Sequence, residues 1–201
     1  DFVKKRNELN KNNGNSRIIA GTPLITKPGG YGSIHIKSPD DAKAKVEELI
    51  SQGADIIKIA LEDDLQGRIW PMMSLQEAKS IVETAHARNK RVSAHVSHVR
   101  NLPIAIEAGV DDIAHMVVEP LDAELINQMV KKTIYMVPTL ELWQGVSRIH
   151  NLDWDRTAMG NTERYFAAGG RIALGTDFAG YINEFDRGFP ITEVTLLKKA
   201  G

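Results

Sequence analysis

Short apolar runs rich in β-branched residues alternate along the chain with longer segments whose apolar positions repeat at helical spacing. Runs of this composition, bounded by turn residues, are typical of buried strands. We predict strands at 17–25, 55–61, 91–96, 111–118, 134–140 and 171–177. The regular alternation predicts an α/β fold in which each strand is followed by a helix.

The segments between these runs carry the signals of helix ends. Ser38 is predicted to cap a helix that has Pro39 at its first position and ends before Gly53. Ser74 and Glu77 have the spacing of a capping box at the start of the next helix. Further helices are predicted within 101–109, 120–132 and 155–170.

Strands that are apolar on both faces and separated by helices indicate a parallel sheet covered by helices on both sides. An open doubly wound sheet and a closed TIM (β/α)8 barrel both satisfy this pattern. A dinucleotide-binding open sheet would carry a G-x-G-x-x-G turn after its first strand, and the sequence has no such turn. The glycines of segment 28–32 do not follow that pattern and are more typical of a turn.

Composition and net charge limit the classes of partner that the chain is expected to bind. The chain has 201 residues, 42% of them hydrophobic, with 25 basic and 26 acidic residues, which is typical of one globular domain. The near-zero net charge gives no reason to expect nucleic acid or a membrane surface as partner, and the basic segment 1–11 is interpreted as a solvated helix face.

The sequence shows no signal peptide and no apolar run near the roughly 20 residues that span a bilayer. The cellular compartment stays open, because the chain begins at Asp1 without an initiator methionine. The absence of cysteine removes disulfides and thiolate metal sites, so six histidines and many carboxylates are the available metal ligands.

Lys58 lies in the middle of the apolar run 55–61, where an ammonium group is costly unless it is paired, neutralised or chemically altered. Three more polar residues lie in or at the end of predicted strands: His95, His115 and Asp177. In a β/α barrel the carboxyl ends of the strands meet at one mouth, so we expect a shared site. Two histidines and an aspartate suit Zn²⁺ or a similar divalent ion in a catalytic site.

Each of these four residues also has a purely structural explanation. A strand histidine can be a hydrogen-bonded core residue, an aspartate after Gly-Thr can cap a helix, and a lysine can reach out of a strand end. Because all four fall at comparable strand positions, a shared site explains them better than four separate accidents.

The segments GADIIKI, VSAHV, AGVDDIAHM, VPTL and ALGTD, in that order, together with the loop GTPLITKPGG, resemble the amidohydrolase superfamily. Within it, they are most similar to the imidazolonepropionase-related, prolidase-like group that includes dipeptide and N-acyl-amino-acid hydrolases. The resemblance extends over nearly the whole chain from about Ile18 onward.

The resemblance implies a metal-dependent hydrolase that acts on a C–N bond of a small substrate, with a binuclear centre that is most simply zinc. Lys58 resembles the family's carboxylated bridging lysine, N6-carboxylysine. His95 and His115 resemble its ligands to the second metal, and Asp177 resembles its metal-binding catalytic base.

The family also brings a His-x-His pair from its first barrel strand, and this sequence contains none. Assigning the six predicted strands as the third to eighth of the barrel accounts for this. We therefore expect residues 1–201 to form a single partial barrel domain, a fragment lacking the first two strands and the flanking β-domain of a larger enzyme.

Three residues are weaker candidates for substrate binding: His98, Tyr31 and Arg100. The acidic run 62–64 follows Lys58 on the mouth side and could favour a cationic substrate, but a run of charges is more typical of a solvated loop. Two other functions stay open: a type I aldolase-like or dehydroquinase-like barrel in which Lys58 forms a Schiff base, and a non-catalytic oligomeric or binding module.

Six of eight barrel strands would leave two exposed sheet edges, which invite pairing with another chain. We therefore predict that the chain is a homo-oligomer with little or no hydrolase activity by itself. Light scattering checks the first expectation, and a monodisperse monomer would contradict it. Robust turnover that chelator abolishes and Zn²⁺ restores would contradict the second.

Overall fold

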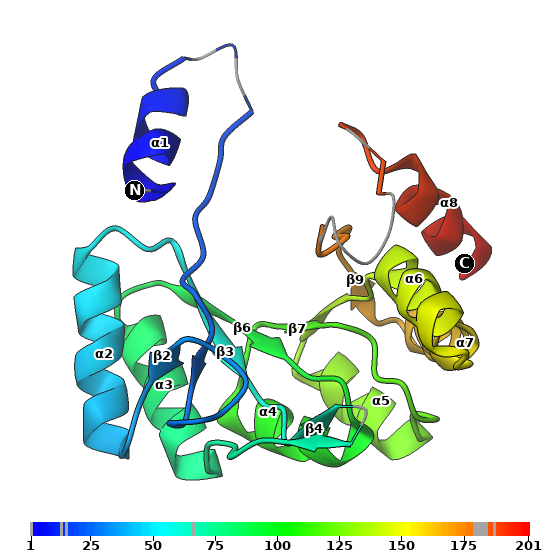
Figure 1. The fold of residues 1–201 in the computed structure, drawn as a ribbon, viewed down its shortest axis with the longest axis horizontal. Helices are drawn as coiled ribbons and strands as arrows, with labels where there is room; N and C mark the ends of the chain where they lie inside the picture. Colours follow the sequence, from blue (N-terminus) through cyan, green and yellow to red (C-terminus); the bar gives the residue numbers. More distant parts are fainter. Residues whose placement is uncertain (1, 13, 15, 66, 179–184, 187) are drawn as a thin grey trace. The chain divides into compact units, whose positions relative to one another are not determined.

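The computed structural model describes residues 2–12, 14, 16–65, 67–178, 185–186 and 188–201. The chain forms two compact units (Figure 1). The first comprises Asp1–Ala94 with Glu107–Val110, and the second comprises His95–Ile106 with Asp111–Gly201.

A seven-stranded sheet has the order β2-β1-β3-β6-β7-β8-β9, and β4 and β5 form a separate antiparallel hairpin. The strands are β1 (Ile25–Thr26), β2 (Ile34–His35), β3 (Ile56–Ala60), β4 (Asp64–Leu65), β5 (Arg68–Ile69), β6 (Arg91–His95), β7 (Asp112–Ala114), β8 (Tyr135–Val137) and β9 (Arg171–Ile172). The helices are α1 (Phe2–Leu9), α2 (Pro39–Ser51), α3 (Leu75–Ala87), the 3-10 helix η1 (Val99–Asn101), α4 (Leu102–Ala108), α5 (Ala123–Lys131), α6 (Leu140–His150), α7 (Trp154–Ala167) and α8 (Ile191–Lys199).

In the first unit, β1 pairs in parallel with both β2 and β3, and α2 packs beside α3 (Figure 1). Alternation along β3 buries Ile57 and Ile59 completely, whereas Lys58 between them is only half-buried. The predicted capping box of α3 is confirmed, because the Ser74 hydroxyl accepts from the Glu77 N–H and the Glu77 carboxylate accepts from the Ser74 N–H.

Glu77 also forms an ion pair with Lys27, with 2.6 Å between Oε1 and Nζ. Burial acts to raise the pKa of Glu77, but the Lys27 ammonium and the Ser74 donors outweigh it and hold that pKa below its ordinary value. The carboxylate therefore stays charged while it ties the segment after β1 to the start of α3.

Helix α1 corrects the interpretation of the basic segment 1–11 as a wholly solvated face. Lys4 and Lys5 are exposed, but Arg6 is buried, and its guanidinium contacts the Asp55 carboxylate and donates to the Gly53 carbonyl at 2.9 Å. One arginine of the basic segment thus anchors the helix to the end of α2.

In the second unit, β7, β8 and β9 pair in parallel, with Ile113 opposite Met136 and Met136 opposite Ile172. Helices α6, α7 and α8 pack together beside them. Tyr165 of α7 is fully buried, and its hydroxyl donates to the Ile134 carbonyl at 2.6 Å. Burial raises the pKa of Tyr165 to about 12.

The predicted α/β class with a parallel sheet is confirmed, and it is consistent with a partial TIM-like barrel. The first predicted strand, 17–25, is wrong except at its last residue, because β1 begins only at Ile25. The fourth, fifth and sixth predicted strands are shorter than expected, and β2, the β4–β5 hairpin and α6 were not predicted. The interpretation of 62–64 as a solvated loop is wrong at Glu62, which is 1% exposed. Within the described residues, no helix combines the length and apolarity that crossing a bilayer requires.

Candidate functional site

A histidine pair lies in the second unit, where the sequence predicted metal ligands. His95 is the last residue of β6, and His115 directly follows β7. Their rings meet edge to face at 4.8 Å, and His95 Nδ1 lies 3.0 Å from His115 Nε2. Both side chains are buried, with exposed fractions of 6% and 5%. The structure therefore brings these two predicted residues into direct contact.

Further contacts fix the orientation of both rings. The Thr139 hydroxyl lies 2.8 Å from His115 Nδ1, and the Ser97 hydroxyl lies 3.4 Å from His95 Nε2. The Trp143 ring packs edge-on against His115, with 5.8 Å between the ring centroids. These contacts turn Nδ1 of His95 and Nε2 of His115 toward each other.

Asp177 lies beside the same histidine nitrogen. Its Oδ2 is 4.0 Å from His115 Nε2, and 59% of its side chain is exposed. Its backbone is left-handed, with φ of 49°, a conformation that aspartate tolerates better than most residues. Three of the four predicted ligands therefore gather at one place in the second unit.

Lys58 belongs to the first unit. Its Nζ lies 3.1 Å from the Ser93 hydroxyl, and its backbone N–H donates to the Thr22 hydroxyl at 2.8 Å. Both hydrogen bonds lie within that unit, between β3 and its neighbours. The half-buried amine is thus held by a neutral hydroxyl group on one side.

The two histidines fit one divalent ion. Zn²⁺ binds histidine nitrogen at about 2.0–2.1 Å, so two such nitrogens in tetrahedral geometry lie about 3.3 Å apart. The 3.0 Å between His95 Nδ1 and His115 Nε2 is close to this spacing. Within the described ranges, however, no three His, Asp or Glu side chains are arranged to hold an ion as they stand. Asp177 would have to approach from its present 4.0 Å.

His98 forms a dyad with Glu119, a residue that the sequence analysis did not single out. One Glu119 carboxylate oxygen contacts His98 Nδ1, and the other accepts from the Val99 N–H at 2.9 Å. His98 Nε2 is buried and has no hydrogen-bond partner among the residues described. His98 follows β6, and Glu119 lies 21 residues further along the chain, so no local pattern in the sequence predicts their contact.

The other two candidates for substrate binding lie on surface elements. Arg100 is exposed in η1. Tyr31 lies after β1 and packs edge-on against Trp70 at 5.1 Å. Tyr31 belongs to the first unit and Arg100 to the second.

Helix α6 begins at the histidine pair in an unusual way. Thr139 precedes it with a left-handed backbone, and its hydroxyl contacts His115 instead of capping the helix. The Glu193 carboxylate of α8 takes over the cap, accepting from the Leu140 N–H at 3.0 Å and the Glu141 N–H at 2.7 Å. Glu193 is completely buried. Helix α8 therefore fixes the residue that orients His115.

Both carboxylates at this junction have raised pKa values. Burial raises the pKa of Glu193, against the two backbone N–H donors, and the charge of Glu141 adds to the rise. Burial also raises the pKa of Glu141, and the Asp186 charge acts in the same direction. The junction between α6 and α8 is thus sensitive to protonation.

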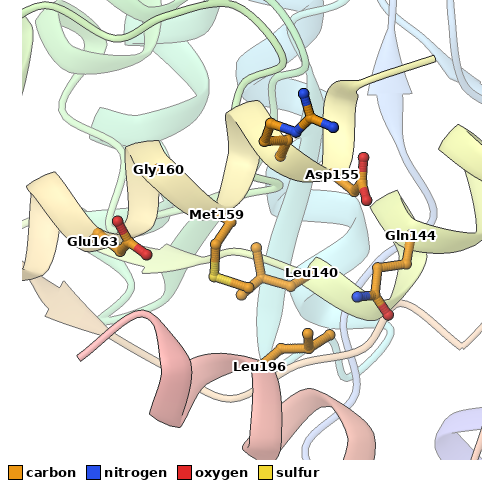
Figure 2. A pocket seen from close by; sticks show the side chains of 8 residues that line it. Leu140, Gln144, Asp155, Met159, Gly160, Glu163 and Leu196 are labelled. Carbon is orange, nitrogen blue, oxygen red and sulfur yellow. The ribbon is translucent and has the colours of Figure 1, made fainter.

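A hollow of about 420 Å³ lies among α6, α7 and α8 (Figure 2). Leu140, Met159 and Leu196 point toward one another in it, and Asp155, Gln144 and Glu163 lie around them. None of the predicted site residues lines it. It adjoins the site only through Leu140, the first residue of α6.

No family model matches the chain. An uncharacterised protein of Mycobacterium tuberculosis is 27% identical over 202 residues, which covers 92% of this chain and 53% of that protein. Ochratoxinase from Aspergillus niger is 29% identical over 171 residues, covering 76% of this chain and 35% of the enzyme.

Solved structures agree with these sequence matches. A Xaa-Pro dipeptidase with methionine bound in its active site superposes with a TM-score of 0.82 at 21% identity, covering 99% of this chain and 56% of the dipeptidase. The A. niger ochratoxinase structure superposes with a TM-score of 0.68 at 26% identity, covering 90% of this chain and 43% of the enzyme. The chain thus spans about half, or less, of the length of the relatives that it matches.

Glu193→Gln is expected to flatten the pH dependence of stability above pH 4.5. Because the pKa of Glu193 is raised from 4.5, the folded chain holds a proton that the unfolded chain has released. The free energy of unfolding therefore falls as pH rises from 4.5 through the raised pKa. Glutamine does not ionise, so this part of the slope disappears.

Urea unfolding at a series of pH values up to neutrality measures this slope. The exposed Glu163→Gln variant is the matched control and should keep the wild-type slope. Equal slopes for wild type and Glu193→Gln would show that the buried carboxylate does not carry the effect.

Proposed function

Because the chain has the fold of the amidohydrolase superfamily, we propose that it is part of a metal-dependent hydrolase that cleaves a C–N bond in a dipeptide or an N-acyl amino acid. The observation that carries the proposal is the histidine pair, whose facing nitrogens lie 3.0 Å apart with Asp177 beside them. The similar proteins named dipeptidase and ochratoxinase support a hydrolase.

In this proposal His95 and His115 hold a divalent ion, most simply Zn²⁺. Such an ion, when bound, polarises a carbonyl and lowers the pKa of water. Thr139 keeps the His115 ring in the orientation that turns Nε2 toward His95, as hydrogen-bonded partners of metal-binding histidines commonly do. Trp143 packs on the same ring and limits its movement.

Asp177 is proposed as the general base. Its carboxylate is the most exposed group of the cluster, so a substrate and its attacking water can reach it. It takes the proton of that water and delivers a proton to the leaving amine, which breaks the C–N bond. Asp177 Oδ2 lies 4.0 Å from His115 Nε2, so the carboxylate is next to the proposed ion site.

Lys58 is proposed as N6-carboxylysine, whose carbamate oxygens could serve as ligands to a divalent ion. Its neutral amine would attack CO₂, form a new N–C bond and release one proton, leaving a carbamate with two oxygen donors. Ser93, which lies 3.1 Å from Nζ, would then donate to the modified group. The support for this role is the resemblance of the segment GADIIKI to that family.

Metal titration of the chain tests the proposal directly. We expect Co²⁺ to bind with the visible spectrum of a site containing histidine, and Zn²⁺ to displace it. Thr139→Val should weaken binding by about 10–100-fold through loss of the outer hydrogen bond, and His95→Asn or His115→Asn should weaken it more. Exposed His150→Asn is the matched control and should bind as wild type does.

Asp177→Asn separates catalysis from metal binding. In the whole hydrolase of which the chain is proposed to be a part, turnover of dipeptides or N-acyl amino acids should fall by about 10²–10⁴-fold, while Co²⁺ still binds. Metal affinity that is unchanged in both His95→Asn and His115→Asn would overturn the proposed centre. Turnover that persists in chelator would overturn the proposed chemistry.

A further inference from the structure

Two loops of the first unit are in close contact at the carboxyl end of its strands. One is segment 27–33 after β1, and the other is segment 61–74, which carries the β4–β5 hairpin. A Cβ atom on Gly30 would lie 2.5 Å from the Pro71 carbonyl oxygen, so only glycine permits this approach. The Trp70 N–H donates to the Asp63 carbonyl at 2.9 Å and closes the hairpin loop. The contact is therefore built into both loops.

Three side chains stack across this contact, and we call Tyr31, Arg68 and Trp70 the aromatic wall. Tyr31 meets Trp70 edge to face, with 5.1 Å between centroids. The Arg68 guanidinium lies over the Trp70 ring, 5.1 Å from its centroid. Arg68 and Trp70 are two residues apart in an extended segment, so they share one face of the hairpin.

The Arg68 guanidinium stacks on the Trp70 ring and does not pair with a carboxylate among the described residues. The Arg68 side chain is exposed, and it forms no ion pair with any residue in the described part of the chain. Stacking on a ring leaves the edge of the guanidinium, with its N–H donors, available to a planar anion. A carboxylate matches that edge with two parallel hydrogen bonds.

The wall lies at the edge of the sheet where β/α barrels bind their substrates. β1 and β3 are parallel, with Ile25 opposite Ile59, so the loops that follow them leave from the same edge. Both loops lie at the lower side of the first unit in Figure 1. Lys58 is in the middle of β3, the strand that precedes the hairpin loop.

We propose that the aromatic wall is a recognition site for a substrate that carries a free carboxylate next to a ring, such as an N-acyl aromatic amino acid or a dipeptide ending in one. Arg68 binds the carboxylate, and the Tyr31 and Trp70 rings contact the substrate ring. The identification of this ligand as a substrate rests on the proposed hydrolase function, but the binding itself does not.

Calorimetric titration of the whole chain, without added metal, tests the wall with three probes. N-acetyl-L-phenylalanine carries the ring and the carboxylate, its amide lacks the charge, and N-acetylglycine lacks the ring. We expect the acid to bind about tenfold tighter than the amide, the size of one charge-assisted hydrogen bond. Arg68→Gln should abolish this preference, and Tyr31→Ala or Trp70→Ala should abolish the preference for phenylalanine over glycine.

Arg171→Gln is the matched control. Arg171 also stacks on an aromatic ring, with its guanidinium 5.6 Å from the Tyr135 centroid, but it lies at the start of β9 and in the second unit. This variant should keep both preferences. Circular dichroism establishes that each variant is folded before it is titrated.

An acid-over-amide preference that survives Arg68→Gln, or that is missing in the wild type, would overturn the proposal. Failure of the proposed metal centre gives a different result: metal affinity would be unchanged in His95→Asn and His115→Asn, while the acid-over-amide preference persisted. The two proposals therefore fail separately.

Discussion

In the second unit β7, β8 and β9 pair in parallel, and a parallel pair can be joined only by a crossover that returns the chain to the starting edge. Helix α5 makes the first crossover, and α6 and α7 make the second. Every strand therefore ends at the same edge. Asp177, which follows β9, reaches His115, which follows β7, for this reason. The site depends on strand direction more than on any single contact.

The same edge has to accommodate the start of α6, which Thr139 does not cap. The Thr139 hydroxyl can serve either the helix or His115, and it contacts His115. The helix N–H groups then need another acceptor, because unpaired buried donors are destabilising. Glu193 supplies it from α8 and is fully buried as a result. This burial raises the pKa of Glu193, and the charge of Glu141 adds to the rise.

Local signals predicted the helices that carry their own caps. Ser38 and Ser74 cap α2 and α3 as expected, since a hydroxyl and the N–H three residues later lie within one turn. Helix α6 could not be predicted this way, because Thr139 does not cap it and segment 134–140 continues the apolar strand before it. A cap donated from α8, more than 50 residues later, leaves no local pattern.

The position of the histidine pair could be predicted, because the order of the strands and the residues at their ends are visible in the sequence. The partners that orient these residues could not: Thr139, Glu119 and Glu193 each act across a tertiary contact. Lys58 shows the same limit. The apolar neighbours of Lys58 predicted that its ammonium group would need a partner. The Ser93 hydroxyl, which accepts a hydrogen bond from Lys58 Nζ, lies on another strand. Lys58 and Ser93 are 35 residues apart in the sequence, so their contact leaves no local pattern.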